Sequence, residues 1–195
     1  MDEQQHNLQT KPEQELQKKG GSLLDTIKFI VLALAIVTPI RMFIAQPFIV
    51  SGSSMDPTFA TGQYLIVDEI SYHLGDPKRG DVIILRYPKD TTKFFIKRVI
   101  GLPHENVVIN KGTVTIVNAQ YPEGLAISEP YIKFSKNDTM TKMLGEGEYF
   151  VMGDNRAASS DSRYWGVVPR DLVVGRALIR LLPIASASVL PGDFN

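Results

Sequence analysis

An apolar segment behind a polar N-terminal stretch constrains the fold of this chain more than any other feature. Residues 1–22 are polar and rich in Gln, a composition that cannot bury enough surface to fold alone, so we expect a disordered tail there. From Leu23 the sequence turns apolar, and the run from Phe29 to Ile40 carries no charge. Such a run predicts a helix that is buried inside a protein, placed in a membrane, or part of a cleaved signal peptide.

A transmembrane helix over residues 23–45 explains this segment best. The uncharged run itself has 12 residues, fewer than the ~20 that a bilayer requires. Lys28 and Arg41 flank the run, however, and their long side chains can extend outward to the lipid headgroups. A cleaved signal peptide fits less well, because the polar stretch before the run is long and no small-x-small site follows at a suitable distance.

The charges around this segment predict how the chain crosses the membrane. Residues 42–77 contain neither Lys nor Arg. Four lysines precede the apolar segment or lie near its start: Lys11, Lys18, Lys19 and Lys28. By the positive-inside rule we expect residues 1–22 in the cytoplasm and the chain after the helix outside it, as in a single-pass membrane protein with an extracytoplasmic domain.

The chain after residue 45 carries the pattern of short β-strands. Runs of β-branched and aromatic residues end at Gly, Pro, Asn or Asp, which predicts strands at 64–70, 81–88, 94–103, 106–118, 148–154 and 173–183. The stretch at 106–118 has a hairpin signal at Asn110-Lys111-Gly112, and polar, irregular sequence follows it. We therefore expect a mainly β fold, with a main domain from 46–103 and 148–195 and a small inserted β subdomain at 104–147.

Composition removes several classes of function. The chain has no Cys, which excludes disulfides, thiolate metal sites and cysteine nucleophiles. Its 21 basic and 21 acidic side chains balance, so we expect no nucleic-acid binding through a broad positive field. The three histidines, His6, His73 and His104, stand far apart and form no metal-binding motif. We expect catalysis without a metal or cofactor, through Ser, Lys, Arg, Asp or Glu.

The segment Val50–Thr58 presents a candidate nucleophile directly after the predicted membrane helix. Small residues precede Ser54 and leave room for another backbone, while Pro57 keeps Asp56 out of the helical region. These features suit an exposed hydroxyl at Ser54. Taken alone, the segment is explained more simply as a Ser-rich linker that leaves the membrane.

Lys97 is a candidate general base. In a strand over 94–103 it shares a face with Phe95 and Val99, and the opposite face, which carries Arg98, is otherwise apolar as well. Apolar surroundings strip water from an ammonium group and lower its pKa, and a neutral lysine can take the proton of a serine. The alternative is an edge strand whose charges prevent aggregation.

Together with the loop Gly153–Gly166, these segments form a specific pattern. The loop, GDNRAASSDSRYWG, combines turn formers, paired charges and hydroxyls behind a predicted strand, and alone it would be an ordinary turn. The order SGSSMDPT, RGDVIILRYP, KRVIGLP and MGDNRAASSDSRYWGVVP behind an apolar segment resembles the type I signal peptidases of peptidase family S26. The resemblance covers most of residues 23–183.

The resemblance implies a serine endopeptidase, a signal peptidase I, that uses a Ser-Lys dyad. Ser54 matches the nucleophile and Lys97 the general base, and Ser159 matches a serine that orients the lysine. Two structural ion pairs that hold the loop against the catalytic strand are matched by Arg98 with Asp154 and by Asp161 with Arg163. The implied fold is a pair of antiparallel β-sheets, as in signal peptidases and LexA-like domains, behind one N-terminal transmembrane helix.

Three positions depart from the family pattern. Gly52 stands where some members have a serine that helps to bind the oxyanion, which leaves the second donor unassigned, and losing one such donor can cost ~10²-fold in rate. His104 follows GLP where glycine is usual, and Ala157-Ala158 replace a commoner Asp-Asn pair. The last two departures lie beside the expected chemistry.

The implied substrate is the signal peptide of an exported preprotein, which is cut after small residues at positions −1 and −3. By resemblance and strand position, we expect four residues to line the pockets for these side chains: Val50, Met55, Phe95 and Ile96. The lipid bilayer is an expected partner, and the secretion translocase a further one. The host membrane would be the cell membrane, or a thylakoid membrane in a photosynthetic organism.

Other functions are open on sequence alone. A LexA-like self-cleaving protease shares the Ser-Lys pair but needs a DNA-binding module, which residues 1–22 cannot form. A Ser-His-Asp hydrolase would need His73 or His104. A catalytically silent, membrane-tethered β domain could bind secretory chains without cutting them. The sequence also leaves open whether the small-x-small stretch Ala185–Ala187 is cut by the protein itself.

Overall fold

The computed structural model describes residues 23–39 and 45–193 of the chain. The chain divides into two compact units between Val37 and Thr38, and helix α1 (Leu23–Pro39) fills the described part of the first. No helix in these two ranges is both long and apolar enough to cross a membrane, and α1 itself has 17 residues. The transmembrane helix at 23–45 and the tail at 1–22 stay predictions, since 1–22 and 40–44 lie outside the described residues.

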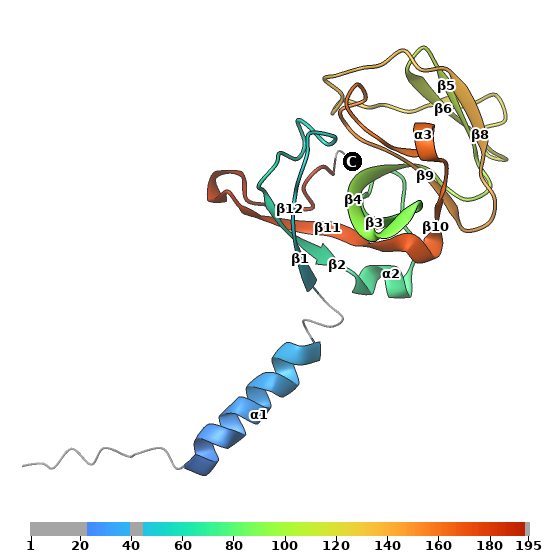
Figure 1. Cartoon of the computed structure of the whole chain (residues 1–195). Helices are drawn as coiled ribbons and strands as arrows, with labels where there is room; N and C mark the ends of the chain where they lie inside the picture. The colour runs from blue at the N-terminus through green and yellow to red at the C-terminus, as the bar shows by residue number, and fades with distance from the viewer. Residues whose placement is uncertain (1–22, 40–44, 194–195) are drawn as a thin grey trace, which may run out of the picture. The chain divides into compact units, whose positions relative to one another are not determined.

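The second unit is built on an eight-stranded antiparallel sheet (Figure 1). Its main path runs through seven strands in the order β1 (Ala45–Ile49), β2 (Tyr64–Asp68), β11 (Val173–Leu182), β3 (Val82–Tyr87), β4 (Asp90–Gly101), β9 (Glu148–Met152) and β10 (Val168–Pro169). Beside this path, β12 (Ser188–Val189) pairs with β11. Strands distant in the sequence thus become neighbours, and β11, near the C-terminus, joins β2 to β3.

A second antiparallel sheet lies inside the predicted insertion. Its four strands follow the order β7 (Leu125–Ala126), β6 (Thr113–Val117), β5 (Asn106–Asn110) and β8 (Met140–Met143). The predicted hairpin joins β5 to β6, and Lys111 and Gly112 have φ of 48° and 84°, as a two-residue type I′ turn requires. The prediction of a mainly β fold with two antiparallel sheets is confirmed, while the division at 104–147 into separate domains stays a prediction.

The predicted strands overlap observed ones, and the differences lie at their ends. β2 stops at Asp68, before the predicted end, because the Asp68 carboxylate accepts a hydrogen bond from the Ser71 amide at 3.0 Å, and helix α2 (Ile70–Leu74) begins there. The sequence pattern does not predict β1, because its residues continue the apolar run and Pro47 is unusual in a strand. Three short helical turns complete the unit: α3 (Ser162–Trp165), η2 (Arg170–Leu172) and η3 (Ile184–Ser186).

Buried apolar side chains fix the second sheet to the first. Ile100 of β4 and Phe150 of β9 pack in one cluster with Val107 of β5, and Figure 1 shows β5, β6 and β8 gathered beside β9. Gly101 permits this close approach, because a Cβ there would lie 2.4 Å from a Val107 methyl group. The second sheet is therefore attached to β4 and β9, which carry Lys97 and lead into the loop that begins at Gly153.

Candidate active site

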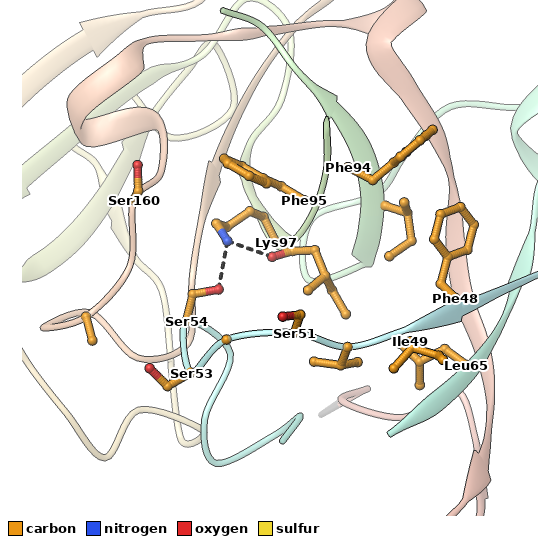
Figure 2. A pocket seen from close by; sticks show the side chains of 15 residues that line it. Phe48, Ile49, Ser51, Ser53, Ser54, Leu65, Phe94, Phe95, Lys97 and Ser160 are labelled. Atoms are coloured by element: carbon orange, nitrogen blue, oxygen red, sulfur yellow. Dashed lines mark hydrogen bonds between the residues drawn. The ribbon is translucent and has the colours of Figure 1, made fainter. Parts of the chain in front are cut away.

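A cavity of about 430 Å³ borders Ser54 (Figure 2). Phe48 and Ile49 of β1 form one side, and Phe94 to Lys97 of β4 form another. The rings of Phe48 and Phe94 meet edge to face, with centroids 5.4 Å apart. β1 pairs only with β2, and β9 pairs with β4 only from Arg98 onward, so within the described part of the chain two strand edges without a further neighbour border this cavity.

Lys97 and Ser54 meet beside this cavity although 43 positions separate them in the sequence. Lys97 Nζ lies 2.8 Å from Ser54 Oγ, and the amine also donates a hydrogen bond to the Ile96 carbonyl oxygen at 2.8 Å (Figure 2). Lys97 is 3% exposed, whereas Ser54 is half-buried. A buried amine is therefore within hydrogen-bond range of a hydroxyl that borders open space.

Burial sets the protonation of this amine. Loss of hydration lowers the pKa of Lys97 to about 8, from its ordinary value near 10.5, although the carboxylates of Asp161 and Asp154 act in the opposite direction. The Phe95 ring, with its centroid 5.2 Å from Nζ, is part of the apolar cover. Near neutral pH a fraction of the amine is therefore uncharged and able to accept a proton.

Ser54 lies in a turn, and contacts from two directions fix it. Met55 and Phe59 anchor the turn in the core, where they are 1% and 0% exposed. From the loop after β9, the Asn155 amide donates a hydrogen bond to the Ser54 carbonyl oxygen at 3.0 Å, and the Asn155 side chain donates one to the Ser53 carbonyl oxygen at 3.1 Å. The sequence pattern assigns no role to Asn155, although its place in the GDN turn is a usable signal.

Gly153 allows the loop to reach Ser54. A Cβ at this position would lie 2.3 Å from the Ser54 carbonyl oxygen and 2.2 Å from Ser159 Oγ. Neither distance is compatible with a side chain. The first residue of the GDN turn is therefore glycine for a packing reason, and the sequence pattern alone does not reveal this reason, because it depends on a segment about 100 residues earlier.

The hydrogen bond expected from Ser159 to Lys97 is not present. Ser159 is buried, and its Oγ has no hydrogen-bond partner among the described residues. Its side chain packs against Gly153, while the Lys97 amine is engaged by Ser54 and by the Ile96 carbonyl. The orienting role that the resemblance implies for Ser159 therefore has no supporting hydrogen bond in this structure.

Arg98 and Asp154 form a two-point ion pair next to Lys97 and Ser54. Their Nε–Oδ1 and Nη2–Oδ2 distances are 2.8 and 2.6 Å, and both side chains are fully buried. Thr58 Oγ1 donates a further hydrogen bond to this carboxylate at 2.6 Å. The pair thus links the strand of Lys97, the loop after β9 and the turn of Ser54.

Asp161 and Arg163 form the second expected pair. The guanidinium donates to both carboxylate oxygens at 2.8 Å, and Asp161 Oδ2 also accepts a hydrogen bond from the Gly153 amide at 3.0 Å. Asp161 therefore ties the end of the loop to its beginning.

Gly52 is not free to act as the second oxyanion donor. Its amide donates a hydrogen bond to Thr61 Oγ1 at 3.0 Å. A Cβ at Gly52 would meet no atom within 4 Å, but the φ of +94° strains any residue other than glycine. Ser51 and Ser53 also line the cavity.

Three of the four residues that the sequence predicts for the substrate pockets border the cavity: Val50, Phe95 and Ile96. Met55 does not, because its side chain fills the core beneath the turn. Phe48, Ile49 and Phe94 border the cavity without having been predicted. Phe48 and Ile49 belong to β1, which continues the apolar run and shows no boundary in the sequence.

The two histidines in the described ranges lie away from this cavity. His73 and His104 are exposed, and neither borders it. Those ranges also hold no group of three or more His, Asp or Glu side chains placed to bind a metal ion. Among the described residues that line the cavity, the titratable side chain is Lys97.

Comparison with known proteins finds close relatives. Residues 23–182 match the profile of the family described as signal peptidase, peptidase S26. A signal peptidase I of Leptolyngbya laminosa is 37% identical over 175 residues, which cover 86% of this chain and 83% of that protein. Signal peptidase I T of Bacillus subtilis is 35% identical over 189 residues, which cover 89% and 93%. A solved signal peptidase I of Enterococcus faecalis is 34% identical, with a TM-score of 0.44, and covers 52% of this chain and 97% of that one.

Proposed function

The chain belongs to the signal peptidases of peptidase family S26, and we propose that it is a membrane-tethered Ser-Lys protease that removes signal peptides from exported preproteins. One observation carries the proposal. The Lys97 amine lies 2.8 Å from Ser54 Oγ, and burial lowers the pKa of that amine to about 8. A base with a pKa near the working pH is suited to activate a hydroxyl.

The proposed reaction needs only one titrating group. Neutral Lys97 takes the proton of Ser54 as Oγ bonds to the carbonyl carbon of the scissile peptide. The ammonium then gives its proton to the departing nitrogen as the C–N bond breaks, which leaves an acyl-enzyme. A water molecule, deprotonated by the same amine, attacks the ester, and Lys97 returns the proton to Ser54 as the product leaves.

The two open strand edges support binding of the signal peptide as an added β-strand. The backbone groups of β1 and of the first half of β4 border one cavity, which also contains Ser54. An extended peptide would use these groups for main-chain hydrogen bonds and place alternate side chains in the cavity. Val50, Ile84 and Ile96 give that cavity an apolar lining, which suits the small side chains expected at positions −1 and −3.

Attachment to the lipid bilayer through α1 is part of the proposal. Its side chains are mostly apolar and exposed, and Lys28 and Arg41 mark the ends of the charge-free run. Ser54 follows Arg41 by only 13 residues, which keeps the nucleophile near the membrane surface, where a signal peptide ends. The lysines before the segment favour a cytoplasmic N-terminus and an extracytoplasmic catalytic domain, with the translocase as a source of substrate.

Cleavage of a preprotein by the detergent-solubilised full chain tests the proposal. We expect Ser54→Ala and Lys97→Ala each to abolish cleavage, while circular dichroism and melting show a folded protein. Lys89→Ala, on an exposed turn, is the matched control and should retain wild-type activity. Activity close to wild type in either dyad variant would refute the dyad.

The same assay separates the alternatives. A silent binding domain would retain the preprotein without processing it. A Ser-His-Asp enzyme would lose activity when His73 and His104 are both replaced, whereas we expect that double variant to cleave normally.

A further inference from the structure

We propose that two carboxylates of the inserted segment, Glu129 and Asp138, position the catalytic serine through the loop after β9. The proposal rests on the function proposed above, because it takes Ser54 to be the nucleophile. Both residues lie between β7 and β8, in the chain that connects strands of the second sheet. Glu129 is linked to Gly153 through Arg156, and Asp138 is linked to it through Arg163 and Asp161. Gly153 in turn packs against Ser54.

The first route passes through Arg156. Both guanidinium nitrogens at its tip contact the Glu129 carboxylate, with an Nη1–Oε2 distance of 3.0 Å, and its Nε donates a hydrogen bond to the Gly153 carbonyl oxygen at 3.1 Å. The side chains of Arg156 and Glu129 are 3% and 9% exposed. A buried guanidinium that loses its carboxylate is strongly unfavourable, so Arg156 can stay on Gly153 only while Glu129 neutralises it.

The second route passes through Arg163. This side chain forms ion pairs with Asp138 and with Asp161, and Asp161 accepts the hydrogen bond from the Gly153 amide at 3.0 Å. The two routes therefore hold opposite sides of one residue, its N–H and its C=O. In addition, the Ala157 amide donates a hydrogen bond to the Phe134 carbonyl oxygen at 3.2 Å, which joins the same two segments through the backbone.

Gly153 passes this constraint to the nucleophile by direct packing. Its Cα faces the Ser54 carbonyl oxygen so closely that a Cβ would lie 2.3 Å from that atom, and the Asn155 amide donates to the same oxygen at 3.0 Å. A shift of the loop would therefore shift Ser54 relative to Lys97, which β4 holds separately. Misplacement of a reacting atom by about 1 Å can cost ~10²-fold in rate.

The test is Glu129→Gln, which keeps the shape of the side chain and removes its charge. With the full chain in detergent and a preprotein substrate, we expect kcat to fall about 10- to 100-fold. We expect KM to change less than about threefold, because most of the cavity wall comes from β1 and β4. Glu123→Gln, an exposed carboxylate of the same inserted segment, is the matched control and should keep wild-type kcat and KM.

A double variant checks that the effect travels through Arg156. In an Arg156→Gln background, Glu129→Gln should lower kcat by less than about twofold, because the route is already broken. Asp138→Asn, at a side chain that is 23% exposed, serves as a second variant if Glu129→Gln does not fold. We expect it to lower kcat in the same manner.

The proposal is overturned if both single variants keep wild-type kcat below their melting temperatures, or if the loss lies in KM alone. It is also overturned if Glu129→Gln lowers kcat equally with and without Arg156. A wild-type chain that does not cleave preproteins would instead refute the proposed function, so the two failures are distinguishable.

Discussion

Lys97 and Ser54 meet at one point but are held in opposite ways. Lys97 lies within a strand, paired with Ile83 of β3 and followed by Arg98, which pairs with β9. Ser54 lies in a turn, and its carbonyl oxygen accepts a hydrogen bond from the Asn155 amide of the loop after β9. The difference teaches that the sheet sets the surroundings of Lys97 and hence its pKa, whereas the loop contacts the backbone of Ser54.

Among variants of the strand that carries Lys97, Lys97→Arg has the largest expected effect on activity. A guanidinium stays protonated at any pH that the enzyme tolerates, so it cannot accept the proton of Ser54. We expect kcat for preprotein cleavage to fall by about 10³-fold or more. Lys89→Arg is the exposed control, and cleavage by Lys97→Arg at a tenth of the wild-type rate would contradict the assignment.

Gly153→Ala tests the contact between the loop after β9 and Ser54. The new methyl group would collide with the Ser54 carbonyl oxygen and with Ser159, so the loop must move away from Ser54. We expect kcat to fall about 10²-fold. In the control Gly75→Ala, the Cβ meets its nearest atom at an ordinary 3.6 Å, and kcat should be unchanged. Equal activity of the two variants would show that Gly153 does not position Ser54.

The pH profile sharpens the comparison. Below about pH 8 the amine becomes protonated and inactive, so kcat/KM should fall up to tenfold per pH unit, and above that value it should level off. Phe95→Ala admits water to Lys97, raises its pKa and moves this limb to higher pH. Glu129→Gln should lower the rate but leave the midpoint nearly in place. If both variants shifted the pH midpoint by the same amount, the strand and the loop would not act separately on the pKa of Lys97 and the position of Ser54.

The smallest expected effect is on stability. Lys97 binds its proton less tightly in the folded chain than in the unfolded chain, so the wild type gains stability as pH rises from about 8 to 10.5. Lys97→Met removes the buried charge, and at pH 7 we expect it to be about 1 to 2 kcal/mol more stable, after the loss of two hydrogen bonds is included. Denaturant unfolding at pH 7 and pH 10 checks this. A difference that does not shrink at pH 10 would contradict it.

Much of the fold follows from local patterns, because β-branched runs that end at turn residues mark β3, β9 and β11. β1 does not follow, because the apolar run from Leu23 continues into it without a boundary and Pro47 opposes a strand assignment. Strands of two residues, such as β7 and β12, carry too few side chains to leave a pattern and depend on their neighbours in the sheet.

The candidate site likewise contains residues that the sequence predicts and residues that it does not. The polar residues of the site can be identified from the motifs around Ser54, Lys97 and the loop after β9. A hydroxyl suits a nucleophile, an amine suits a base, and opposite charges suit an ion pair. The apolar lining depends on which strands face each other, so Phe48 and Phe94 could not be predicted from their own segments. The same holds for Glu129, whose contact with Arg156 arises from the packing of the inserted chain on the loop.

The open edge of β1 bears on whether two copies of the protein pair with each other. An exposed row of backbone donors and acceptors is a template for pairing with any extended chain, including a second copy of the same strand. Pro47 stands in the middle of β1 and has no amide hydrogen, and in edge strands proline usually turns this gap outward. A short guest peptide can bond on either side of the gap, whereas a long, continuous ladder between two copies is interrupted at its centre.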